Sequence, residues 1–209
     1  MYFKIHNEGW VFVVSSLIIT VITFPFFPII GLILLILSFC IFYFFRDPIR
    51  SIPVEDVIVS PADGQIVFLD KSKLPEECGI DGNYLKISIF LDLYNVHVNR
   101  LPTSGSIKNI KYIPGKFFRA NVDKASKDNE RNIILIENIK KEKIVVVQIA
   151  GLIARRIVTE VSKEEELDQG TRLGMIRFGS RADLYFENYN PLVKVNQKTI
   201  AGETLIAKK

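Results

Sequence analysis

The pattern of hydrophobic and polar positions begins with a long uncharged stretch, Trp10–Phe45. As one helix it would measure about 54 Å at 1.5 Å per residue, whereas the hydrocarbon core of a bilayer is about 30 Å thick. Pro25 and Pro28 divide the stretch, and proline breaks or kinks the interior of a helix. The pattern therefore predicts two apolar helices joined as a hairpin, Trp10–Phe24 and Ile29–Phe45.

The predicted hairpin is typical of attachment to a membrane. Each helix is short for a full crossing, so a hairpin that dips into the bilayer and one that crosses it both remain open. A signal peptide is disfavoured because the apolar run is too long and no small-residue cleavage site follows it. A buried soluble hairpin fits poorly with so much uncharged sequence. Lys4 precedes the hairpin and Arg46 and Arg50 follow it, which predicts that both ends lie on the cytoplasmic side.

After residue 46 the pattern changes to short apolar or alternating segments separated by Gly, Pro, Asn and Asp. Apolar and polar positions alternate along Leu85–Leu91, which is the period of a half-buried strand. Further strands are expected at Ile66–Leu69, Ile133–Ile136, Ile144–Ile149, Val193–Val195 and Thr204–Ala207. One short helix is expected over Val158–Leu167. We therefore predict a mainly β fold, a sandwich or barrel-like domain over residues 47–209, behind an N-terminal apolar α-helical hairpin over residues 1–46.

Composition and charge limit the kinds of partner that the protein is expected to bind. The 209 residues carry a net charge of +4, which fits ordinary solubility and also fits attraction to an anionic lipid surface, at about 1 kcal/mol per basic residue near it. Basic residues do not form a stripe interleaved with aromatic residues, so we expect no nucleic-acid partner. Cys40 and Cys78 predict neither a disulfide framework nor a metal cluster.

The candidate chemistry centres on Gly179-Ser180, which interrupts an apolar strand pattern. Glycine inside such a pattern marks a bulge, a bend or a close approach of the backbone. Gly-Ser pairs are also common in loops, so the pair alone favours a kinked strand. The surrounding motifs change this interpretation.

The segment Gly174–Asp183 resembles the cleavage motif of pyruvoyl-dependent phosphatidylserine decarboxylases, in their short bacterial and archaeal branch. Other segments resemble the same family in the expected order: Ser60–Gly64, Asn95–Arg100, Pro114–Phe118, Asp128–Asn132 and Gln148–Arg156. Each motif is weak alone, but together they cover almost the whole chain. The ordered series of motifs therefore makes the sequence similar to this family over almost its whole length.

The resemblance implies an enzyme that removes the serine carboxylate of phosphatidylserine as CO2 and leaves phosphatidylethanolamine. The family works through a Schiff base between the substrate amine and a pyruvoyl cofactor, which withdraws electrons as pyridoxal phosphate does. In the family, the serine that corresponds to Ser180 attacks the carbonyl of Gly179 and turns the amide into an ester. β-Elimination and loss of ammonia then leave the pyruvoyl group.

Such processing would give two chains, 1–179 and 180–209, held together as a heterodimer; a higher homo-oligomer stays open. The resemblance also assigns a processing triad. Ser180 is the nucleophile, His97 the base and Asp63 the group that orients the base. A lone histidine is more often structural, and Asp63 before Gly64 is also a turn signal, so the triad depends on the resemblance. His6, before the hairpin, is expected to be inert.

Arginines are the candidates for the lipid phosphate, because guanidinium groups match phosphate oxygens. Arg155 and Arg156 are such candidates, although exposed surface charge explains them equally well. Many relatives carry a second histidine where this chain has Arg100. This leaves open whether His97 makes both proton transfers or Arg100 takes an electrostatic part. No metal ion is expected.

Two alternatives remain at this stage. The first is the same decarboxylation acting on an archaeal-type or other phosphoserine lipid. The other is a membrane-tethered β-sandwich carrier or phosphotransfer module, because Ser60–Gly64 also resembles turns in such sandwiches. A carrier would need a modifiable lysine at a hairpin tip, and none is convincing. A phosphotransfer module would use His97 as phosphoacceptor and leave Gly179-Ser180 intact.

Overall fold

The computed structural model describes the chain except residues 1–2, 54–55, 119–127, 152–155 and 178–179. The chain divides into two compact units, Met1–Ile49 and Arg50–Lys209. In the first unit β1 (Phe3–Ile5) pairs with β2 (Arg46–Pro48), which keeps the residues after the hairpin in that unit.

The predicted hairpin is confirmed as α1 (Trp10–Thr23) and α2 (Pro28–Phe44), preceded by η1 (Asn7–Gly9). The turn between the helices is tight, because a Cβ on Gly31 would lie 2.7 Å from the Cα atom of Phe24. The hydroxyl groups of Thr20 and Ser38 lie 3.3 Å apart between the helices. Within the described residues, no helix reaches the length and apolar character needed to cross a membrane.

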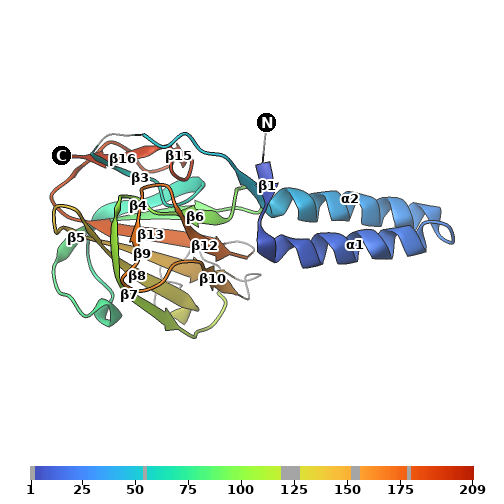
Figure 1. Ribbon diagram of the computed structural model, residues 1–209, viewed down its shortest axis with the longest axis horizontal. Helices are drawn as coiled ribbons and strands as arrows, with labels where there is room; N and C mark the ends of the chain where they lie inside the picture. Colours follow the sequence, from blue (N-terminus) through green and yellow to red (C-terminus); the bar gives the residue numbers. More distant parts are fainter. Residues whose placement is uncertain (1–2, 54–55, 119–127, 152–155, 178–179) are drawn as a thin grey trace. The chain divides into compact units, whose positions relative to one another are not determined.

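The second unit is built on an eight-stranded antiparallel sheet that curls into a half-barrel (Figure 1). Its strands, in spatial order, are β11 (Glu166–Leu167), β7 (Gly105–Ile113), β8 (Arg131–Asn138), β9 (Lys143–Ala150), β13 (Ser180–Phe186), β5 (Asn83–Leu91), β4 (Gly64–Lys73) and β15 (Lys198–Thr199). The mainly β prediction is therefore confirmed.

Two three-stranded sheets accompany the large one. The first contains β10 (Ile157–Thr159), β12 (Arg172–Ile176) and β6 (Val98–Arg100). The second contains β14 (Asn190–Pro191), β16 (Leu205–Lys208) and β3 (Val57–Val59). A short helix, η2 (Glu76–Cys78), lies in the connection between β4 and β5.

Two local predictions were wrong. The helix expected over Val158–Leu167 is replaced by β10, a turn and β11, because β10 pairs with β12 and β11 pairs with β7. The strand expected at Val193–Val195 is also absent, since these described residues enter a turn in which Gln197 N–H donates to the carbonyl of Lys194. Short β pairings across the chain decided both outcomes.

Both faces of the large sheet are covered, so β5 is not the half-buried strand that its pattern predicted. On one face Ile87, Ile89 and Leu184 belong to the main core. On the other face Tyr185 packs with residues of the segment around η2, and Ser88 is only 1% exposed. Cys78 lies in the same buried cluster as Tyr185, where burial raises the pKa of its thiol to about 11.

Candidate active site

Ser180 lies where three strands of the large sheet have their ends. It is the first residue of β13 and pairs with Leu91, the last residue of β5, and with Ala150, the last residue of β9. Its side chain is fully buried. Among the described residues, the Ser180 hydroxyl has no hydrogen-bond partner. A buried hydroxyl without a partner is unusual and calls for an explanation.

The sheet β10–β12–β6 covers this end of the large sheet. Strand pairing arranges its residues in rows, and two alternate rows, Thr159–Gly174–Asn99 and Ile157–Ile176–His97, point their side chains to the same face. The first row contacts the large sheet through buried amides. Asn99 Oδ1 accepts a hydrogen bond from Gln148 Nε2 at 2.9 Å, and Thr159 Oγ1 accepts one from Asn132 Nδ2 at 3.0 Å. This contact fixes which way the small sheet faces.

The second row faces the strand ends at Ser180. Ile157 and Ile176 pack against Ala150, the residue that pairs with Ser180. His97 continues this row, since Ile176 N–H donates to its carbonyl oxygen at 3.3 Å. Because β6 lies on the Gln148 side of the small sheet, the register carries His97 toward Ser180. The structure thus brings these two predicted site residues to the same end of the fold.

His97 is completely buried, and its ring is oriented by the loop before it. Its Nδ1 atom lies 3.0 Å from the carbonyl oxygen of Asn95. A carbonyl only accepts, so Nδ1 carries the proton in the neutral ring and Nε2 carries the lone pair. The loop is itself fixed, because the Asp92 carboxylate accepts from the N–H groups of Tyr94 and Asn95. The geometry suits a neutral histidine acting as a base through Nε2.

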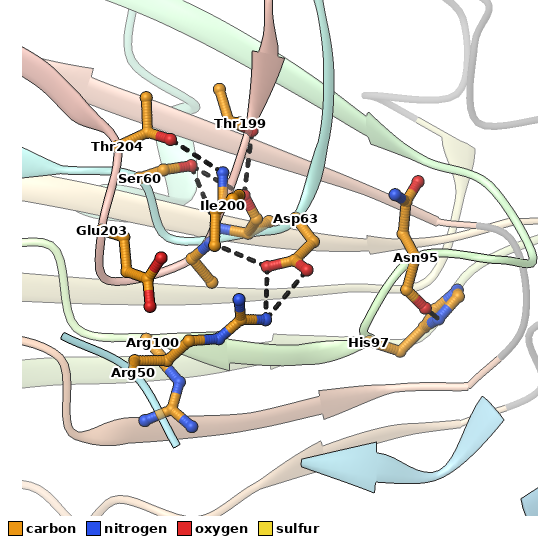
Figure 2. A network of polar contacts seen from close by, with 12 residues as sticks. Arg50, Ser60, Asp63, Asn95, His97, Arg100, Thr199, Ile200, Glu203 and Thr204 are labelled. Carbon is orange, nitrogen blue, oxygen red and sulfur yellow. Dashed lines mark hydrogen bonds and ion pairs between the residues drawn. The ribbon is translucent and has the colours of Figure 1, made fainter. Parts of the chain in front are cut away.

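Asp63 lies in the turn before β4 and is engaged by other partners (Figure 2). Both of its carboxylate oxygens lie 2.9 Å from Nη2 of Arg50. The backbone N–H of Ala201 donates to Oδ1 at 2.7 Å. Within the described part of the chain, no hydrogen bond joins Asp63 to His97, whose ring is shown beside Asn95. The orienting role of Asp63 therefore stays a prediction.

The same turn is bound by the segment that enters and follows β15. Thr199 Oγ1 and Ser60 Oγ both donate to the carbonyl oxygen of Ala62, at 3.0 and 2.7 Å. The hydroxyl of Thr204 accepts from the N–H of Ile200 at 2.9 Å. Figure 2 shows these contacts gathered around Asp63. The predicted site motif is thus held from two sides, by residues before it and by residues near the C-terminus.

The arginine candidates differ in their relation to this network, which Arg100 joins because its N–H donates to the carbonyl oxygen of Pro61 at 2.9 Å. The Arg100 guanidinium group donates to the carbonyl oxygen of Gly170 at 2.9 Å. The side chains of Arg100 and Arg50 both lie near Gly202. Arg156 is exposed, and its carbonyl oxygen accepts from the N–H of Arg177. Gly179 and Arg155 lie outside the described residues. The phosphate-binding role of the arginines stays a prediction.

Several buried amides that hold the site together lie in the family-like motifs of the sequence, but the sequence alone assigned them no role. Asn132 and Gln148 point inward from β8 and β9, and Asn129 donates to the carbonyl oxygen of Ala150 at 2.7 Å. Their signal was available, because these amides interrupt or adjoin apolar strand segments. Buried amides of this kind usually hold backbone or other side chains in place.

A buried ion cluster lies on the opposite face of β13. Arg181 and Asp183 are 2% and 1% exposed, and Arg181 Nε lies 2.8 Å from Asp183 Oδ1. Lys86 Nζ lies 3.1 Å from Asp183 Oδ2. Side chains alternate along a strand, so this cluster faces away from the Ser180 hydroxyl. Its sequence signal was the Arg-x-Asp spacing that directly follows Ser180.

Comparison with known proteins places this geometry in a family. The family model described as phosphatidylserine decarboxylase matches residues 37–207. The chain is 56% identical to a phosphatidylserine decarboxylase proenzyme of Pelagibacter ubique, over 99% of this chain and 97% of that protein. It is 49% identical to the proenzyme of Ruegeria pomeroyi, over 97% and 94%, and 45% identical to that of Rickettsia typhi, over 97% and 89%.

Proposed function

The chain belongs to the phosphatidylserine decarboxylase family, and we propose that it matures by cutting its own Gly179-Ser180 bond. It is a pyruvoyl-dependent carboxy-lyase, made as a proenzyme, that converts phosphatidylserine into phosphatidylethanolamine and CO2. This assignment decides against the carrier and phosphotransfer alternatives. The two products of maturation are the chains 1–179 and 180–209.

One observation carries the proposal: Ser180 is a buried hydroxyl at a strand end that faces the row containing His97, and it has no partner among the residues that the structure describes. His97 Nε2 takes the hydroxyl proton, and Ser180 Oγ attacks the carbonyl carbon of residue 179. The C–N bond breaks as the new ester forms, and the freed nitrogen takes up a proton. The ester thus joins the two future chains.

The second stage releases the smaller chain. A base removes the Cα proton of residue 180, the Cβ–Oγ bond breaks, and Oγ leaves within the carboxylate of residue 179. The resulting dehydroalanine takes up water and loses ammonia, which leaves a ketone at the new N-terminus. Atoms and charges balance with water as the only co-reactant.

Position 180 suits a pyruvoyl group. β13 is an interior strand, paired on both sides, so its first residue remains held after the chain is cut. The bound group supplies a carbonyl that withdraws electrons from the substrate α-carbon as CO2 departs. The burial of residue 180 keeps bulk water away from the group at that position. His97 then serves to hold or return a proton there, while Arg100, Arg155 and Arg156 are the candidates for the lipid phosphate.

The enzyme acts on membrane lipids, and the hairpin supports direct attachment to a membrane on its cytoplasmic side. Large apolar side chains cover the outside of both helices and the turn between them, including Val11, Phe26, Ile29 and Phe39, which are 72%, 74%, 78% and 66% exposed. An exposed apolar surface of this size is typical of a site that binds a membrane or another protein. Arg46, stacked 3.7 Å from the Tyr43 ring centre, places a positive charge at the end of α2.

Denaturing mass analysis tests the proposal. Wild-type protein should give two chains, the smaller beginning at residue 180 with a ketone in place of an amine. Ser180→Ala should remain one chain and release no CO2 from phosphatidylserine. An intact wild-type chain with full activity would refute self-processing.

A time course separates the base from its neighbours. His97→Ala should accumulate uncut precursor, with cutting slowed roughly 10²- to 10⁴-fold, because general-base assistance is worth that much. Arg100→Ala is the matched control, since a guanidinium group stays protonated and does not act as a base. Cutting at the wild-type rate in His97→Ala would assign proton removal to another group.

A further inference from the structure

A chain of buried amides runs from β10 to β6 beneath the candidate site. Asn132 Nδ2 donates to Thr159 Oγ1 and to Gln148 Oε1, each at 3.0 Å. Gln148 Nε2 then donates to Asn99 Oδ1 at 2.9 Å. The three amide side chains are fully buried. Each contact orients the next amide, so Asn99 receives a hydrogen bond at its oxygen and presents its NH2 group elsewhere.

The chain ends in an unused donor. Among the described residues, Asn99 Nδ2 is buried and has no acceptor. Ser180 Oγ is likewise buried without a partner there, and Ser180 lies two residues along β13 from Ala182, which pairs with Gln148. Buried polar groups in native proteins are normally hydrogen-bonded, because an unsatisfied group costs free energy. A donor and an oxygen left open at strand positions related by register point to a contact made during the reaction.

Strand geometry directs the open donor toward the reacting residue. Asn99 and His97 are two residues apart, so their side chains leave the same side of the strand. Gln148 pairs with Ala182, and Ser180 is two residues from Ala182 on the same face of β13. The oxygen of the Asn99 amide is taken by Gln148, so its nitrogen is left for a different partner. Arg181 and Asp183, by contrast, lie on the opposite face of the sheet.

We propose that Asn99 is a catalytic residue of self-processing whose Nδ2 donates a hydrogen bond to Oγ of residue 180 as that oxygen leaves. This inference rests on the proposed self-cleavage. During elimination the Cβ–Oγ bond breaks, its electron pair stays on Oγ, and negative charge spreads over the departing carboxylate. A positioned amide N–H stabilises charge that develops in a site without water. The Cα proton goes to a base, which Asn99 does not replace.

The role predicts a distinct chemical fingerprint. Loss of Asn99 should leave ester formation intact and slow the elimination, whereas loss of His97 should slow ester formation itself. Hydroxylamine cleaves an ester but not the original amide, so it reports whether the ester has formed. Asn99→Ala should therefore accumulate an apparently uncut chain that hydroxylamine splits between residues 179 and 180. His97→Ala should resist the same treatment.

Two variants of the full-length protein test the hydrogen bond itself. Asn99→Asp keeps an oxygen for Gln148 but has no NH2 group, while Asn99→Ala removes both. Spontaneous cleavage should slow about 10²-fold or more in each, the usual effect of removing one such donor. If Asn99→Ala does not fold, Asn99→Asp decides, because it retains the contact with Gln148.

Asn138→Ala is the matched control for lost stability. Asn138 is also a buried amide of β8, at the far end of the strand, where it donates to Glu142 and Tyr189. The Asn138→Ala variant should cleave at the wild-type rate even if its melting temperature falls as much as that of the Asn99 variants.

The outcomes separate the two proposals. Wild-type protein that never cleaves at residue 180 would refute the proposed function itself. Wild-type protein that cleaves, together with an Asn99→Asp variant that cleaves equally fast, would refute only the role of Asn99. Slow cleavage in Asn99→Ala without a hydroxylamine-sensitive bond would also refute it, since Asn99 would then act before the ester.

Discussion

At the scale of single residues, Asp63 combines a structural and a proposed chemical role. Its carboxylate joins Arg50, which follows the helical unit in the chain, to Ala201 near the C-terminus. The Arg50 and Asp63 side chains are 9% and 12% exposed, so the pair is largely removed from water. Breaking a buried pair by removing one partner leaves an uncompensated charge, which is more costly than removing both.

Stability and processing should therefore respond differently to substitutions of this pair. Asp63→Asn should lower the free energy of unfolding by about 3 kcal/mol, because it leaves Arg50 buried without a counter-charge. The double variant Arg50→Met with Asp63→Asn should recover most of that loss in urea unfolding. If Asp63 also serves His97, the double variant should still cleave slowly.

Arg50→Met alone is the control for the loss of packing around the guanidinium group. A double variant that regains both stability and the wild-type cleavage rate would show that Asp63 has only the structural role. A double variant no more stable than Asp63→Asn would instead contradict the account of the ion pair.

At the scale of elements, the helices of the hairpin depend on neighbouring residues, whereas the β strands depend on distant ones. α1 and α2 formed where the uncharged sequence and two prolines predicted them, since helix formation depends on neighbours along the chain. β10 formed where a helix was expected, because its three residues pair with β12. A strand depends on partners distant in sequence, and its own pattern does not contain them.

Removal of the hairpin gives a test at this scale. Deletion of residues 1–49 should move the protein from the membrane fraction to the soluble fraction, because the apolar outer surface of α1 and α2 is lost. The deletion retains Arg50 and hence the ion pair with Asp63, so the β unit should keep its circular dichroism spectrum. Full-length protein that stays soluble without detergent would contradict membrane attachment through the hairpin.

At the scale of the whole molecule, maturation would turn one chain into two that must stay together. β13 would belong to the small chain yet lies between β9 and β5 of the large chain. Glu142 adds a second attachment, since its carboxylate accepts from the hydroxyl of Tyr189 at 2.7 Å and lies 2.6 Å from Nζ of Lys209. Both partners would belong to the small chain.

This attachment should weaken in acid. Burial raises the pKa of Glu142, but hydrogen bonds from Lys209, Asn138 and Tyr189 outweigh it, and the pKa lies below its usual 4.5. A carboxyl group with a lower pKa in the folded state contributes stability above the unfolded value and loses it as pH falls through the folded value. The free energy of unfolding should therefore decline as pH drops below 4.5.

Glu142→Gln should flatten that decline, measured by urea unfolding of the cleaved protein as pH is lowered from about 6 to about 3. The variant should be less stable than wild type at neutral pH, because the substitution removes the carboxylate that is ionised there. An unchanged slope in the variant would assign the acid sensitivity to other carboxylates.

The sequence by itself determined the hairpin, the main strands and the family, because each rests on residues adjacent along the chain. Uncharged length, proline positions and apolar runs are local, and the Gly-Ser motif with its companions marks residue 180 directly. Only the tertiary structure decided that Asp63 pairs with Arg50, that His97 shares a row with Ile176, and that Asn99 carries an open donor. These facts depend on strand register and on contacts between distant segments, which no local pattern encodes.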